Sequence, residues 1–76
     1  MSPDKLVHMA NQIGQFFGHQ PEDTAAANIA DHLAKYWDPR MRKTIIAHLA
    51  DGGAGLAPAT AKAVGILRDA AAHKAA

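Results

Sequence analysis

The chain has 76 residues, a net charge of +1 and a hydrophobic fraction of 49%, but 18 of its 37 hydrophobic residues are alanine. This length predicts a single small helical domain over residues 1–76, with a thin core because few large apolar side chains are available for burial. The absence of cysteine excludes disulfides and thiolate chemistry.

The charges are unevenly distributed along the chain. Residues 1–38 carry two basic and five acidic side chains, whereas residues 39–76 carry six basic and two acidic ones. Such polarity suits electrostatic docking on a larger protein, although a solvated surface with chance asymmetry gives the same count. The near-neutral total disfavours a nucleic-acid partner.

The N-terminal residues MSPDKLVH lack the basic and apolar regions of a secretory signal. No apolar run approaches the roughly 20 residues that a membrane span needs. We therefore expect a cytoplasmic protein with no membrane partner.

Prolines and capping residues predict an all-α fold, a compact bundle of about four short helices. The expected helices span roughly residues 3–17, 21–37, 39–50 and 58–73. Ser2-Pro3 starts the first, and Asp38-Pro39 ends the second and starts the third. A glycine-rich segment, residues 51–55, stops the third helix, and residues 72–76 are expected to fray.

Apolar residues recur at helical spacing and predict the inward side of each helix. On the first helix these residues are Leu6, Met9, Ala10, Ile13, Phe16 and Phe17. Three branched residues lie off the predicted stripes: Val7, Ile46 and Ile66. Single exposed apolar residues are normal, but three in so short a chain suggest a second face that a partner covers.

The five histidines are scattered, and no two of them have the i, i+3 or i+4 spacing that places two metal ligands on one helix face. Seven carboxylates are also scattered, mostly in first helical turns. The glycine-rich segment lacks the Lys-Ser/Thr of a phosphate-binding loop and follows a helix instead of a strand. We therefore expect a non-catalytic chain with no metal, cofactor or catalytic residues of its own.

The segment HLAKYWDPRMRKTIIAHL, residues 32–49, concentrates aromatic and basic side chains. The two aromatic residues among basic ones fit stacking on a single-stranded nucleic acid, or a protein interface, where Trp, Tyr and Arg are enriched. Trp37 also fits a core position with its edge at an interface. Arg40 and Arg42 suit a partner's carboxylates, an internal contact or solvent, or phosphates of a nucleic acid.

This segment, together with KLVHMANQIGQFF, the Gln20-Pro21-Glu22 step and a Gly-Gly-x-Gly-Leu loop, resembles the delta subunit of NAD-dependent, molybdenum-containing formate dehydrogenases. The resemblance runs from about Pro3 to Val64, and the ordered pair MANQI and WDPRMR is its most specific part. One position departs from the family pattern. Ala57 stands where the family commonly has Asp before proline, which removes an N-cap from the fourth helix.

The resemblance implies a small accessory subunit that helps to hold the quaternary structure together and supports assembly. The implied partner is the catalytic alpha subunit and, through it, the beta and gamma subunits. The implied cofactors of the complex lie on those larger subunits: molybdenum bis-MGD, Fe–S clusters, FMN and NAD. An alternative is a transient chaperone for molybdenum cofactor insertion, and a less favoured one is a small nucleic-acid-binding helical domain.

The residues expected to bind the partner combine the aromatic and basic segment with two amides of the first helix. They are Tyr36, Trp37, Arg40, Arg42, Ile46, Asn11 and Gln12.

Overall fold

The computed structural model of the protein describes residues 2–75, which form four α-helices and no strand. The helices are α1 (Pro3–Phe16), α2 (Glu22–Tyr36), α3 (Pro39–Ala50) and α4 (Pro58–Ala75). The predicted all-α bundle is therefore confirmed, and each helix end lies within two residues of its expected position.

Side-chain caps start α1 and α3, as the sequence predicts. Ser2 Oγ accepts the Lys5 N–H at 3.4 Å, and Asp38 Oδ1 accepts the Met41 N–H at 2.9 Å. These bonds satisfy backbone donors that have no partner within the first helical turn. The connection between α2 and α3 is short, because it consists only of Trp37, the C-cap of α2, and Asp38, the N-cap of α3.

Helix α4 continues to Ala75, two residues beyond the expected end at residue 73. Its last turns have the sequence AAAHKA, and alanine is the strongest helix former, so nothing in this sequence stops the helix. The expected fraying of residues 72–76 stays a prediction, and Ala76 lies outside the described residues.

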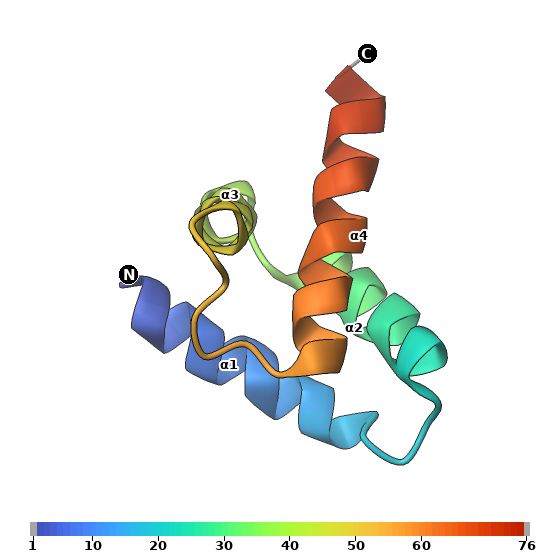
Figure 1. Cartoon of the computed structure of the whole chain (residues 1–76). Helices are drawn as coiled ribbons and strands as arrows, with labels where there is room; N and C mark the ends of the chain where they lie inside the picture. Colours follow the sequence, from blue (N-terminus) through green and yellow to red (C-terminus); the bar gives the residue numbers. More distant parts are fainter. Residues whose placement is uncertain (1, 76) are drawn as a thin grey trace.

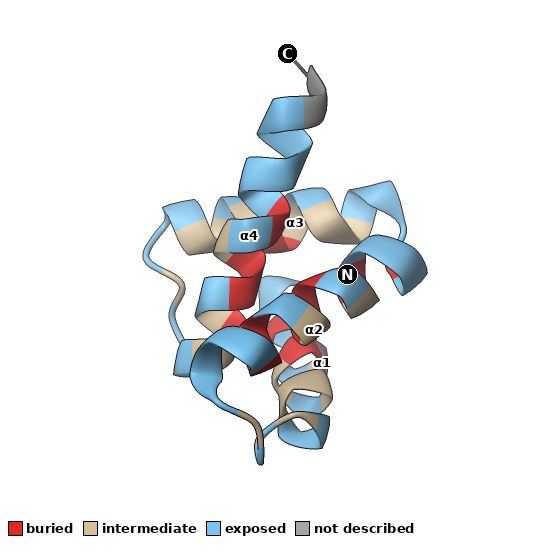
Figure 2. Ribbon diagram, turned by 90° about the vertical axis from the view of Figure 1, so that its right-hand side faces the viewer, coloured by how far each residue is buried: buried red, intermediate tan, exposed pale blue. Residues whose placement is uncertain are grey.

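Figure 1 shows α1 and α2 at the base of the molecule, α3 to one side, and α4 rising past the other helices toward the C-terminus. The most extensive helix–helix contact is between α2 and α4. Figure 2 shows that the buried part of α4 is its lower half, whereas its upper turns are exposed. The core cluster is Leu6, Val7, Ala10, Ala26, Ile29, Ala30, Leu33, Trp37, Ile45, Ala63, Val64 and Leu67.

Two apolar residues of α1 differ from the predicted stripe. Phe16, expected to face inward, is 80% exposed, whereas Val7, expected off the stripe, is buried. On a helical wheel Val7 and Phe16 lie on opposite sides of the stripe, about 115° and about 65° from its centre. The connection between α3 and α4 explains why Val7 is the buried one of the two, because this connection passes over Val7. A Cβ added at Gly55 would lie 3.3 Å from Val7 Cγ1.

The glycine-rich segment stops α3 in the predicted way. The Gly53 N–H donates to His48 O at 2.9 Å and the Gly52 N–H to Leu49 O at 3.0 Å, which is the Schellman pattern. Gly52 and Gly53 have φ of +116° and +65°, values that favour glycine.

A close approach of α1 to α4 generates a stability prediction. A Cβ on Gly14 would lie 2.7 Å from Oγ1 of the buried Thr60 and 3.5 Å from Ile29 Cδ1. Gly14→Ala should therefore lower the free energy of unfolding by about 1–2 kcal/mol, because overpacking outweighs the helix propensity of alanine. Urea denaturation followed by circular dichroism measures the change.

Gly65→Ala is the matched control, since Gly65 is also helical but a Cβ there would meet only Arg68 Nη2, at 3.8 Å. This variant should raise the free energy of unfolding by up to about 1 kcal/mol. Equal stabilisation by both substitutions would show that α1 does not depend on the close approach at Gly14.

Candidate functional site

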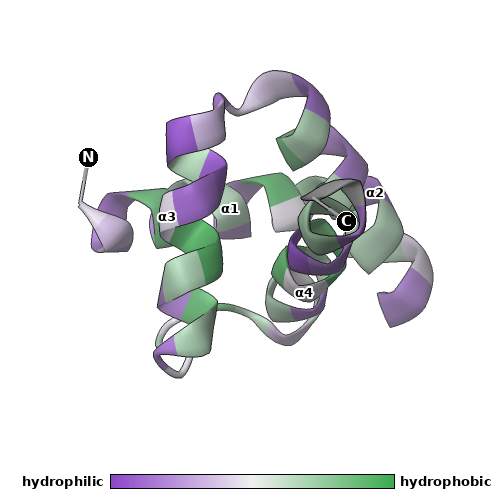
Figure 3. Cartoon of the chain, turned by 90° about the horizontal axis from the view of Figure 1, so that it is seen from above, coloured by the Kyte–Doolittle hydropathy of each residue, from purple (hydrophilic) through white to green (hydrophobic). Residues whose placement is uncertain are grey.

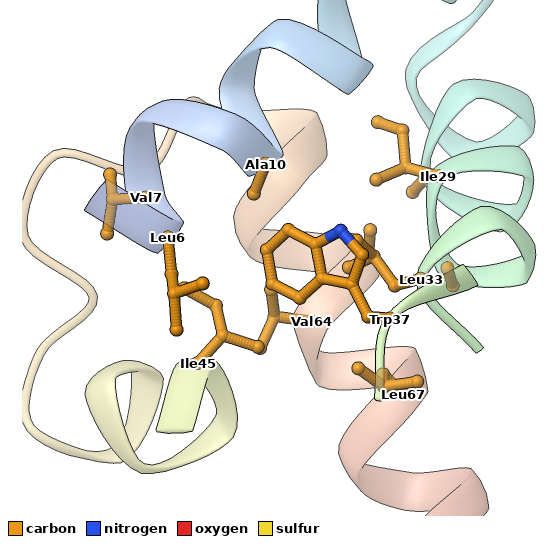
Figure 4. Close-up of a cluster of buried hydrophobic side chains, with 12 residues drawn as sticks. Leu6, Val7, Ala10, Ile29, Leu33, Trp37, Ile45, Val64 and Leu67 are labelled. Carbon is orange, nitrogen blue, oxygen red and sulfur yellow. The ribbon is translucent and has the colours of Figure 1, made fainter. Parts of the chain in front are cut away.

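The chain reverses direction between α2 and α3 at the α2–α3 corner, which we define as residues 34–42. Trp37 is the C-cap of α2, and its N–H donates to Leu33 O at 3.1 Å. Its side chain is only 5% exposed. In Figure 4 the indole lies among side chains from α1, α2 and α4, including Ala10, Leu33 and Val64. Trp37 is thus a core residue, one of the alternatives that the sequence left open.

Arg42 closes the corner from α3. Its Nη1 donates to Ala34 O at 3.0 Å and to Trp37 O at 2.5 Å. Carbonyls at the end of a helix have no partner within the helix, and they carry the negative end of its dipole. The guanidinium satisfies two such carbonyls and brings a positive charge to the end of α2. Of the alternatives for Arg42, the structure shows an internal contact.

Tyr36 and Arg40 face solvent on either side of the corner. Tyr36 is 73% exposed, and its ring lies 4.7 Å from the ring of His32, one turn earlier on α2. Arg40 is exposed, and it forms no salt bridge within the described residues.

The two amides of α1 have different environments. Asn11 Nδ2 donates to Gly55 O at 2.8 Å, and its Oδ1 accepts the Ala57 N–H at 3.0 Å. Asn11 therefore holds the connection that leads into α4, including Ala57, where the expected Asp cap is missing. Gln12 is exposed and makes no side-chain hydrogen bond among the described residues.

His48 also holds this connection, because its Nε2 lies 2.8 Å from Ala54 O. The carbonyl can only accept, so this contact assigns the proton to Nε2. His48 is itself partly buried.

Two apolar grooves follow the sides of α4. The α3–α4 groove has a volume of ≈ 380 Å³ and is lined by Pro39, Arg42, Lys43, Ile46, Leu67 and Ala71. The α2–α4 groove is lined by Ala27, Ala30, Asp31, Ala34, Ile66, Leu67 and Ala70. A smaller hollow between Ala34, Arg42 and the same turns of α4 shares residues with both, so the grooves adjoin each other.

Each groove contains one of the branched residues that the sequence placed off the helix stripes. Ile46 is half-buried in the α3–α4 groove, and Ile66 is 40% exposed beside the α2–α4 groove. Sequence reasoning did not identify Lys43 or the alanines of α4 as residues that line a groove. For the alanines the reason is that this residue type occupies exposed and buried helix positions alike. One signal in the sequence could have indicated these exposed turns of α4: the helix-forming sequence continues after Leu67, but it contains no further large apolar residue.

The α2–α4 groove has an ion pair on its rim. Lys35 Nζ lies 2.9 Å from Asp31 Oδ2, one helical turn earlier at i, i+4 spacing. The hydrogen bond and then the charge of Asp31 raise the pKa of Lys35 above its usual value. Because both side chains are mostly exposed, the pair contributes little to stability.

Within residues 2–75, no three histidine or carboxylate side chains gather closely enough to hold a metal ion. No helix in the same range is long and apolar enough to cross a membrane. The candidate functional surface is therefore the α2–α3 corner together with the two grooves.

The two arginines of the corner generate a stability prediction. Arg42→Ala should lower the free energy of unfolding by about 1–2 kcal/mol, because the last carbonyls of α2 lose a charged donor. Arg40→Ala, two residues earlier on the same helix, should change it by less than about 0.5 kcal/mol. Urea denaturation of both variants, followed by circular dichroism, measures the difference. Similar values for both would mean that Arg42 does not stabilise the corner.

The comparisons with known proteins point to one family. No curated protein and no solved structure gives a significant match to the chain. The model of the FdsD family, described as the NADH-dependent formate dehydrogenase delta subunit, matches residues 5–64, from the first turn of α1 into α4. This range contains the whole α2–α3 corner and most of the chain. The chain therefore belongs to the FdsD family, the delta subunits of NADH-dependent formate dehydrogenases.

Proposed function

We propose that this chain is a non-catalytic accessory subunit that docks on the molybdenum-bearing catalytic subunit of a formate dehydrogenase, where it stabilises the quaternary structure and supports assembly. The observation that carries the proposal is the family match over residues 5–64. A delta subunit belongs to a complex, so its function depends on a surface that another subunit covers.

The composition of the chain supports a binding role over a chemical one. Iron–sulfur clusters are held by cysteine thiolates, and this sequence has no cysteine. Its side chains therefore do not fit a cluster. We place the molybdenum cofactor, the Fe–S clusters, FMN and NAD on the larger subunits, and the cytoplasm is the proposed location of the complex.

The exposed residues of the corner support docking at this place. Trp, Tyr and Arg dominate the binding energy of many interfaces, and here Tyr36 and Arg40 are exposed while Trp37 supports them from the core. We propose direct partner contacts for Tyr36, Arg40 and Ile46. We propose a peripheral contact for Gln12, which is exposed on α1.

Trp37, Arg42 and Asn11 act in this proposal through the fold. Trp37 and Arg42 hold the corner, and Asn11 holds the connection to α4. Their partner-binding role stays a prediction, and substitutions at these three positions change the fold as well as the surface. Arg40 is therefore a better position than Arg42 for testing the docking surface.

Arg40→Glu should weaken binding to the catalytic subunit about tenfold or more at about 0.1 M salt, because it opposes partner carboxylates with a like charge. The measurement is the amount of this chain that co-purifies with a tagged catalytic subunit after co-expression. Lys5→Glu is the matched control, since Lys5 is an exposed cation on α1, outside the corner. Equal recovery of both variants and of the unsubstituted chain would exclude Arg40 from the interface.

The same preparation distinguishes a subunit from an assembly chaperone. A subunit should be present in stoichiometric amount in the active enzyme that carries its cofactors. Recovery only with immature, cofactor-free catalytic subunit would favour the chaperone and would contradict the proposal.

A further inference from the structure

We propose that the α3–α4 groove seats an amphipathic helix of another subunit of the complex, whose apolar face enters the groove and whose acidic edge lies along α3. This inference rests on the proposed function and specifies its mode of contact. It is carried by the shape, the apolar lining and the charges of the groove.

The floor of the groove is apolar and shallow. Ile46 and Pro39 contribute from α3, and Leu67 and Ala71 contribute from α4. Ala71 is exposed in the turns of α4 that rise past the other helices (Figures 1 and 2). Small residues allow a second helix to approach closely, and the projecting turns extend the contact beyond the bundle.

The charges around this groove are of one sign. Its two charged lining residues are Arg42 and Lys43, and α3 as a whole has three basic and no acidic residues. Lys43 is exposed and forms no salt bridge within the described residues. Figure 3, seen from above, shows hydrophilic and hydrophobic segments alternating along α3 beside α4. A complementary partner therefore has apolar residues flanked by aspartate or glutamate.

Arg42 can serve the fold and the partner together. A guanidinium has five N–H donors, and only Nη1 bonds to the carbonyls of α2. The remaining donors are available to a carboxylate from the groove side, and no bond of the corner has to break.

A helix is the segment type that suits this surface. The described residues contain no strand, so there is no sheet edge to which an extended segment can add. An amphipathic helix instead places residues of spacing i, i+3 or i+4, and i+7 into an apolar groove. The α2–α4 groove is a weaker candidate, because its one charged lining residue, Asp31, is already paired with Lys35.

The experiment compares substitutions inside the groove with substitutions beside it, in the co-expressed complex with a tagged catalytic subunit. Ala71→Trp fills the groove, and Lys43→Glu cancels the charge of Arg42 there. Each should lower recovery of this chain about tenfold or more. Ala72→Trp and Lys5→Glu, exposed positions that do not line the groove, should leave recovery unchanged. Circular dichroism of the four variants checks that each is helical.

A photo-crosslinking amino acid substituted for Ala71 then identifies what lies in the groove. We expect a crosslink to a segment of a larger subunit with apolar residues at helical spacing and acidic residues along one edge. Reversing one of those acids to lysine should restore recovery of the Lys43→Glu variant.

Four outcomes would overturn the proposal. A crosslink to a second copy of this chain would make the groove a self-association surface, and a crosslinked segment without acidic residues would remove the charge argument. Unchanged recovery of both groove variants would place the interface elsewhere, while the proposed function would stand. If the unsubstituted chain binds no subunit, the proposed function is wrong and the groove proposal falls with it.

Discussion

The geometry of the molecule depends on the closure of the α2–α3 corner by Arg42. Only Trp37 and Asp38 separate α2 from α3, so the last carbonyls of α2 and the first N–H groups of α3 need partners within a few residues. Arg42 supplies donors to the carbonyls, and Asp38 supplies an acceptor to α3. With both ends satisfied, Trp37 enters the core, while Tyr36 and Arg40 are left on the surface. The same constraint thus determines the internal packing and the exposed residues of the corner.

The thin core explains why α4 is flanked by grooves. Many of the residues between α2 and α4 are alanines, which let the two helices pack closely but leave little side-chain volume to fill the space beside them. Where α3 meets α4, Ile46 and Leu67 provide most of the apolar surface, and Ala71 leaves the groove open toward the C-terminus. A chain rich in larger residues would fill these grooves itself, whereas here a partner can complete the packing.

Much of the fold was predictable because local chemistry determines it. Asp38-Pro39 and the Gly52-Gly53 pair set helix ends through bonds between near neighbours, and these features occur where they were expected. Phe16 and Val7 were misplaced because burial at the edge of a stripe depends on which distant segment passes by, and this information is absent from the periodicity of one helix. For the same reason the sequence could not reveal that Asn11 holds Gly55 and Ala57, 44 and 46 residues away. The grooves were least predictable, since they arise from alanines of separate helices.

The structure shows where the acidic and the basic half of the chain lie in the fold. The acidic half includes the starts of α1 and α2, where carboxylates complement helix dipoles, and one of them, Asp23, pairs with Lys62 of α4. The basic half includes α3, whose three cations have no acidic neighbour on their own helix. Of these, Arg42 is partly neutralised by the end of α2, so Arg40 and Lys43 carry the unbalanced charge of α3. A partner that presents carboxylates to α3 therefore gains attraction without displacing an internal ion pair.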